Sequence, residues 1–201
     1  TVDLHGTFRA QEEAALVIGL LSLVSLGLIF TVLYQRYQSA VLAAIILTSI
    51  PLALIGSVIA LALAGQPLSV ASMIGFITLA GIAARNGILK VSHYINLALL
   101  EGERFGPALV IRGSLERLSP VLMTALCAGL ALVPLLFGAG EPGREILHPV
   151  AVTIFGGLIS STLLDTLLTP VLFLRFGAGP LARILAAREG LPVGAEPKAA
   201  G

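Results

Sequence analysis

The chain has 201 residues, of which 57% are hydrophobic and 11% are charged, and its mean hydropathy is +1.00. This composition is far from that of a soluble globular domain and indicates an integral membrane protein. The formal net charge of +1 creates no global field that would attract nucleic acid, so we expect no nucleic-acid partner. The single cysteine, Cys127, lies inside an apolar run, which excludes a disulfide framework within the chain.

Five apolar segments predict an all-α membrane protein, a bundle of five transmembrane helices. Each segment has ~20 residues or more, which is enough to cross the hydrocarbon core of a bilayer. A stretch near residues 107–118 predicts an amphipathic helix lying on the membrane surface. Residues 176–201, rich in Gly, Ala and Pro, predict a flexible tail. The predicted spans are about 14–33, 40–64, 70–97, 118–137 and 149–174.

Lysine and arginine are distributed unevenly between the two sides of this bundle. Outside the spans, one side carries only Arg9 and Arg144. By the positive-inside rule the richer side is cytoplasmic, which places the N-terminus in the periplasm and the C-terminus in the cytoplasm. An odd number of spans agrees with this orientation. The basic residues of the richer side are Arg36, Arg104, Arg112, Arg117, Arg175, Arg183, Arg188 and Lys198.

The polar residues of the third span are concentrated in its second half. This segment, residues 75–96, reads GFITLAGIAARNGILKVSHYIN and places Arg85 near the membrane centre. An arginine facing lipid at that depth costs about 2.5–3.5 kcal/mol on insertion scales. We therefore expect Arg85 to face the bundle interior, to have a partner and to mark a pathway for ions or protons.

Two further polar residues are predicted at the depth of Arg85. Thr124 of the fourth span and Asp165 of the fifth span lie on the same level when the spans are aligned by their midpoints. Arg85 keeps its proton, so it acts as a fixed charge and not as a proton carrier. Asp165, the only acidic residue inside the spans, is either the carboxylate that Arg85 binds when ionised or a structural counter-ion.

Helical spacing adds three accessory candidates to this polar layer. Ser92 falls on the face of Arg85, whereas Asn86, Lys90 and His93 form an adjacent face. Lys90 either extends its ammonium group to the cytoplasmic interface, which we favour, or forms a functional pair. His93 lies near the interface, where we expect a satisfied polar group and not a ligand or proton carrier.

Several kinds of chemistry have no sequence signal. No His/Cys cluster has metal-ligand spacing, so we expect no metal site. No GxxxxGK[ST] loop for a nucleotide is present, and we expect no cofactor. A nucleophile with a base cannot be assembled from the spans. We therefore expect a protein that is not an enzyme.

Three motifs together resemble the resistance–nodulation–division (RND) efflux transporters, and above all the heavy-metal cation exporters among them. They are the charged residue and Asn after GIAA, the R-L-x-P-x-L-M-T segment, and the GG-x-x-x-S-T run. The resemblance covers about residues 1–175. It lies in the segments GFITLAGIAARNGILKVSHYINL and RLSPVLMTALCAGLALVPLLFGAGEPGREILHPVAVTIFGGLISSTLLDTLLTPVLF.

The resemblance implies the last five of twelve spans of a bacterial inner-membrane permease. Residues 1–13 would then end a periplasmic domain, 14–175 would form the transmembrane domain and 176–201 the cytoplasmic tail. Family members work as homotrimers with a periplasmic adaptor and an outer-membrane channel. The N-terminal half of the permease would be the immediate partner, because it holds the acidic residues of the fourth span.

The resemblance also assigns roles to particular residues. Arg85 and Asn86 match the basic relay residue of the tenth span and the Asn beside it, and Arg117 and Thr124 match the Arg and Thr of the eleventh. The predicted function is the C-terminal part of a proton antiporter that exports metal cations or hydrophobic compounds. The alternative is a truncated or split half-transporter, a structural or interaction module without transport of its own. The start at Thr1 and the missing acidic span favour this alternative.

Overall fold

The computed structural model describes residues 2–137 and 146–189, and every regular element in these two ranges is a helix. Ser39 and Ser69 cap the N-termini of the second and third helices with their hydroxyl groups, so the short turns before them end in defined helix starts. The helices are α1 (Val2–Tyr37), α2 (Ala40–Leu63), α3 (Val70–Leu100), α4 (Pro107–Leu136), α5 (Leu147–Phe176) and α6 (Ala178–Glu189).

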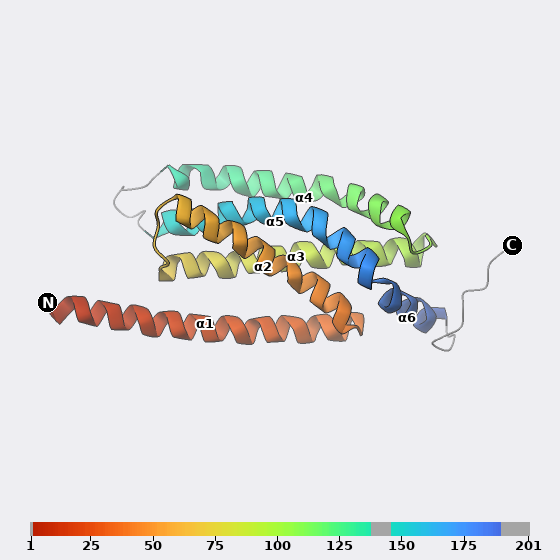
Figure 1. Ribbon diagram of the computed structural model, residues 1–201, viewed down its shortest axis with the longest axis horizontal. Coiled ribbons are helices and arrows are strands. Elements are labelled where there is room, and N and C mark those ends of the chain that lie inside the picture. Colours follow the sequence, from red (N-terminus) through yellow and green to blue (C-terminus); the bar gives the residue numbers. More distant parts are fainter. Residues whose placement is uncertain (1, 138–145, 190–201) are drawn as a thin grey trace.

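Five of these helices are long and apolar enough to cross a membrane: α2 to α5 in full, and Gln11–Tyr37 of α1. This confirms the predicted bundle of five helices. The in-or-out orientation of the termini stays a prediction. The start of α1 lies at the opposite end of the bundle from α6, as five crossings require (Figure 1).

The structure differs from the sequence prediction in two segments. Residues 107–118 do not form a separate surface helix but are the first turns of α4, which begins with Pro107 at its first position. Part of the predicted flexible tail, residues 178–189, is the helix α6. Leu181 of α6 is fully buried, so packing of an apolar side chain holds this segment in place. Residues 190–201 of that tail lie outside the described residues.

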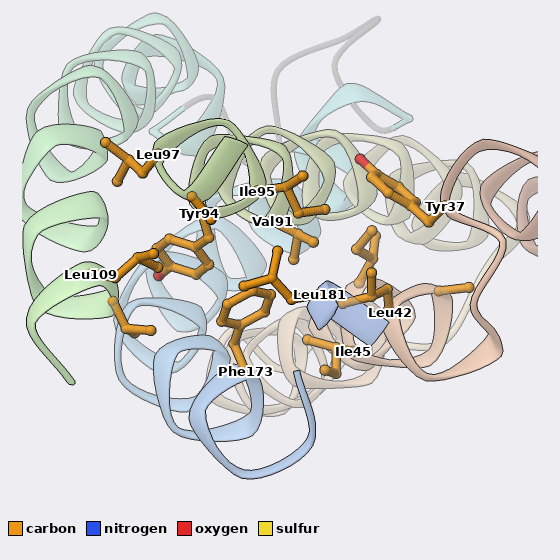
Figure 2. Close-up of a cluster of buried hydrophobic side chains, with 14 of the residues drawn as sticks. Tyr37, Leu42, Ile45, Val91, Tyr94, Ile95, Leu97, Leu109, Phe173 and Leu181 are labelled. Carbon is orange, nitrogen blue, oxygen red and sulfur yellow. The ribbon is translucent and has the colours of Figure 1, made fainter. Parts of the chain in front are cut away.

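Helix α5 occupies the centre of the bundle, in contact with α2, α3 and α4 (Figure 1). Helix α1 lies at the edge, where it contacts α2 and α3 and leaves most of its apolar side chains exposed. Near the α6 end, the rings of Tyr94 and Phe173 pack 4.8 Å apart between their centroids. Leu181 joins the same buried cluster, which therefore links α3, α5 and α6 (Figure 2).

Small residues bring the backbones of α2 and α5 into direct contact. A Cβ added to Gly156 would lie 2.2 Å from the Cβ of Ala60, far inside van der Waals contact. Two hydroxyl groups cross the same interface: Ser57 donates to the carbonyl of Thr153 at 2.7 Å, and Ser160 donates to the carbonyl of Leu52 at 2.8 Å. Close backbone approach with such hydrogen bonds is a typical way for membrane helices to associate.

We predict that Gly156→Ala destabilises the bundle by about 1–3 kcal/mol, because the new methyl group forces α2 and α5 apart. The measurement is the thermal unfolding midpoint of the purified protein in detergent. Gly81→Ala is the matched control, since nothing lies within 4 Å of the Cβ it would add. Equal midpoints for Gly156→Ala and the unmodified protein would contradict the tight contact.

Candidate functional site

A buried ion pair joins α3 to α5 in the middle of the bundle. The ammonium nitrogen Nζ of Lys90 lies 2.7 Å from Oδ2 of Asp165, and it also donates to the backbone carbonyl of Asp165 at 3.0 Å. The hydroxyl of Thr169, one turn further along α5, donates to Oδ1. Both charged residues are only 3% exposed. Each oxygen of the carboxylate thus has a donor, which is the condition for burying such a pair.

This pair bears on two sequence expectations. Asp165 is paired with Lys90 and not with Arg85, which agrees with the counter-ion alternative; the favoured extension of Lys90 to the membrane interface is wrong, because Lys90 is buried. The cause lies in the direction of helical side chains, which point back toward the N-terminus of their helix. Lys90 therefore reaches the level one turn before its own Cα. Applied to the sequence, this rule places the ammonium group of Lys90 at the depth of Asp165.

Four of the five predicted relay residues line one pocket between α3 and α4, with a volume of about 370 Å³. Asp165 does not line it, but its partner Lys90 does, so the ion pair borders the pocket. Among the described residues, the lining includes three cationic side chains and no carboxylate. The polar lining residues are Arg85, Asn86, Lys90, Arg117 and Thr124.

The two arginines of this pocket are not neutralised by the described part of the chain. Arg85 is exposed on α3. Contrary to the expectation from the sequence, it does not face the interior of these five helices. None of the ion pairs between described residues includes Arg85 or Arg117. The Nε atom of Arg117 is buried without a hydrogen-bond partner among them. A buried donor of this kind is costly, so the pocket is suited to an acceptor that enters it from outside.

The remaining accessory candidates are used in other contacts. The hydroxyl of Ser92 lies 2.6 Å from that of Tyr37, which ties α3 to the end of α1. Nε2 of His93 lies 2.8 Å from the carboxylate of Glu116, which also accepts a hydrogen bond from Arg112. His93 thus has a polar partner, as the interfacial interpretation requires. Neither Ser92 nor His93 lines the pocket between α3 and α4.

Comparison with known proteins identifies the family. Residues 1–177 match the AcrB/AcrD/AcrF family. The chain belongs to this family. The match confirms the resemblance to RND transporters, and several heavy-metal resistance proteins are among its AcrB/AcrD/AcrF relatives.

Three similar proteins represent the range of these relatives. The cobalt-zinc-cadmium resistance protein CzcA of Cupriavidus metallidurans is 38% identical over 168 residues, which are 84% of this chain and 16% of CzcA. The multidrug resistance protein MdtC of Proteus mirabilis is 34% identical over 169 residues, with the same two shares. A crystal structure of a heavy metal efflux pump is 35% identical and superposes with a TM-score of 0.71 over 87% of this chain and 17% of the other.

This chain therefore spans about 16% of the length of the curated relatives that it matches. Within the described ranges, no group of three or more His, Cys, Asp or Glu side chains is placed to hold a metal ion. The site that the geometry does provide is the basic pocket between α3 and α4, next to the Lys90–Asp165 pair.

We predict that Lys90→Met destabilises the protein by about 3–5 kcal/mol, because it leaves the buried carboxylate of Asp165 without a counter-charge. The double variant Lys90→Met/Asp165→Leu removes both charges, and we expect it to recover most of that loss. Thermal unfolding of the purified proteins in detergent measures both effects. A double variant less stable than Lys90→Met alone would show that the pair is not a compensated unit.

Proposed function

We propose that this chain forms the C-terminal membrane part of a proton-driven RND permease and supplies the basic side of its proton relay. The observation that carries the proposal is that Arg85, Arg117 and Lys90 line one pocket to which no residue of the described ranges contributes a carboxylate. Membership of the AcrB/AcrD/AcrF family supports it. The resemblance seen in the sequence, which assigns Arg85, Asn86, Arg117 and Thr124 to relay positions of RND exporters, supports it as well.

The chemistry follows from the fixed charge of arginine. An arginine guanidinium is a permanent positive charge, so Arg85 and Arg117 present fixed charges to any group that enters the pocket. A carboxylate from another segment of the permease would be attracted to them while ionised and released once protonated. Proton binding at that carboxylate would thereby change the position of its helix relative to α3 and α4. Asn86 and Thr124 would supply hydrogen bonds to the group in either state.

The same proposal includes the assembly and its cargo. Relatives named as cobalt-zinc-cadmium resistance and multidrug resistance proteins support export of metal cations or hydrophobic compounds. The partners would be the N-terminal half of the permease, two further copies in a homotrimer, a periplasmic adaptor and an outer-membrane channel. The location would be the bacterial inner membrane, with the arginine-rich end of the bundle in the cytoplasm.

A second candidate function is an interaction module that does not transport anything alone. It is favoured by the state of Asp165, the only acidic residue within the predicted spans, which is already paired with Lys90. The five spans predicted from the sequence, 14–33, 40–64, 70–97, 118–137 and 149–174, then contribute no unpaired carboxylate that could carry protons. The exposed apolar side chains of α1 and α4 would be the surfaces for a partner in the membrane.

We predict that Arg85→Ala in the native protein abolishes export at an unchanged level of protein in the membrane. Arg85→Lys should retain part of it, because the fixed positive charge is kept. The measurement is resistance of a sensitive bacterial host to zinc, cobalt and cadmium ions and to hydrophobic dyes, with membrane levels followed by immunoblotting.

Arg104→Ala is the matched control, because Arg104 is an exposed arginine that does not line the pocket. Full resistance with Arg85→Ala, or equal losses with Arg85→Ala and Arg104→Ala, would refute the relay role. No resistance from the unmodified protein, together with capture of a second membrane protein, would favour the interaction module.

A further inference from the structure

A second basic pocket lies at the C-terminal end of α3, between the end of α1, the turn into α2, and α6. Its volume is about 360 Å³. Its walls come from the end of α1, the turn at residues 38–39, the last two turns of α3, and α6. Arg36 and Arg183 are its charged lining residues, and no acidic residue among those described lines it.

Three polar side chains of this pocket are available to bind an anion. Arg36, Asn96 and Arg183 are all exposed, and none of the ion pairs between described residues includes either arginine. A guanidinium group binds a phosphate through two parallel N–H groups, and the amide of Asn96 adds a further donor. Arg183 lies in the middle of α6, so it does not serve as a cation at a helix C-terminus.

The rest of the lining is apolar, which distinguishes this pocket from a simple phosphate site. Ile95, Leu99 and Ile184 line it beside the arginines. Ile95 belongs to the buried cluster that includes Tyr37 and Leu181 (Figure 2), and Leu99 and Ile184 pack against this cluster. A molecule that fits such a lining has an anionic group joined to an apolar part.

The position of the pocket suits a lipid headgroup. It lies where α1 ends at Tyr37 and within the last turns of α3, which ends at Leu100, and so at the level where these spans leave the hydrocarbon core. It also lies at the arginine-rich end of the bundle, which the positive-inside rule assigns to the cytoplasmic leaflet. Basic pockets between helices at this leaflet are suited to anionic lipid headgroups.

We propose that this pocket binds the phosphate of an anionic phospholipid, with Arg36 and Arg183 on the phosphate and the start of the acyl chains against Ile95, Leu99 and Ile184. The bound lipid joins α6 to the end of α1, two elements far apart in the sequence. This site is separate from the pocket between α3 and α4. Ser92, Ile95 and Asn96 line the lipid site, whereas Arg85 and Asn86 line the pocket between α3 and α4. It does not depend on the proposed transport function.

The test is native mass spectrometry of the purified native protein after incubation with equal amounts of phosphatidylglycerol and phosphatidylcholine. We expect the unmodified protein to retain phosphatidylglycerol in preference. Each arginine contributes roughly fivefold to the affinity, so Arg36→Gln/Arg183→Gln should lose about 25-fold. Arg36→Lys/Arg183→Lys should retain most of the binding, which separates loss of charge from loss of folding.

Arg104→Gln/Arg175→Gln is the matched control, since it removes two exposed arginines from the same end of the bundle without touching the pocket. We expect it to bind phosphatidylglycerol like the unmodified protein. Equal retention of the two lipids, or equal losses in both Gln double variants, would overturn the proposal. So would displacement of phosphatidylglycerol by millimolar inorganic phosphate, because the site would then bind the free anion.

Discussion

The contact between α2 and α5 is the constraint on which the rest of the bundle depends. Gly156 allows the two backbones to approach so closely that a single added methyl group does not fit beside Ala60. The hydroxyls of Ser57 and Ser160 then bind carbonyl groups of the facing helix, which fixes the register of the two helices. Since α5 also contacts α3 and α4, this register determines where Asp165 lies.

The position of Asp165 in turn determines how the cations of α3 are used. Lys90 is drawn into the bundle and its charge is balanced there, with Thr169 and a backbone carbonyl completing the hydrogen bonds. A buried pair of this kind adds little net stability but makes loss of either partner costly. Arg85, five residues earlier and on another face of the helix, is left in the open pocket with Arg117. Asp165 is therefore bound in the ion pair with Lys90, whereas we propose that Arg85 and Arg117 bind a carboxylate of a partner segment.

Much of this arrangement follows from the sequence, and the failures have physical reasons. Five long apolar segments predict five helices, and spacing from the span midpoints places Arg85 and Thr124 in one layer, as the shared pocket bears out. The counter-ion alternative for Asp165 agrees with its pairing to Lys90, whereas the favoured extension of Lys90 to the interface was wrong. The depth of a Cα is not the depth of a long side chain, and Lys90 reaches back by a turn. The surface helix near 107–118 was wrong because a change in polarity does not interrupt a helix that begins with Pro107.

The two basic pockets follow one electrostatic rule. Arginine cannot be neutralised by losing its proton, so a pocket lined by arginines without a carboxylate attracts an anion from elsewhere. Arg85 and Arg117 lie within candidate spans, so we propose that their anion comes from another protein segment, because the bilayer core offers none. Arg36 and Arg183 line a pocket at the end of the bundle, where phospholipid headgroups are abundant. In this proposal the depth of each pocket, more than its residue types, decides the kind of anion that it binds.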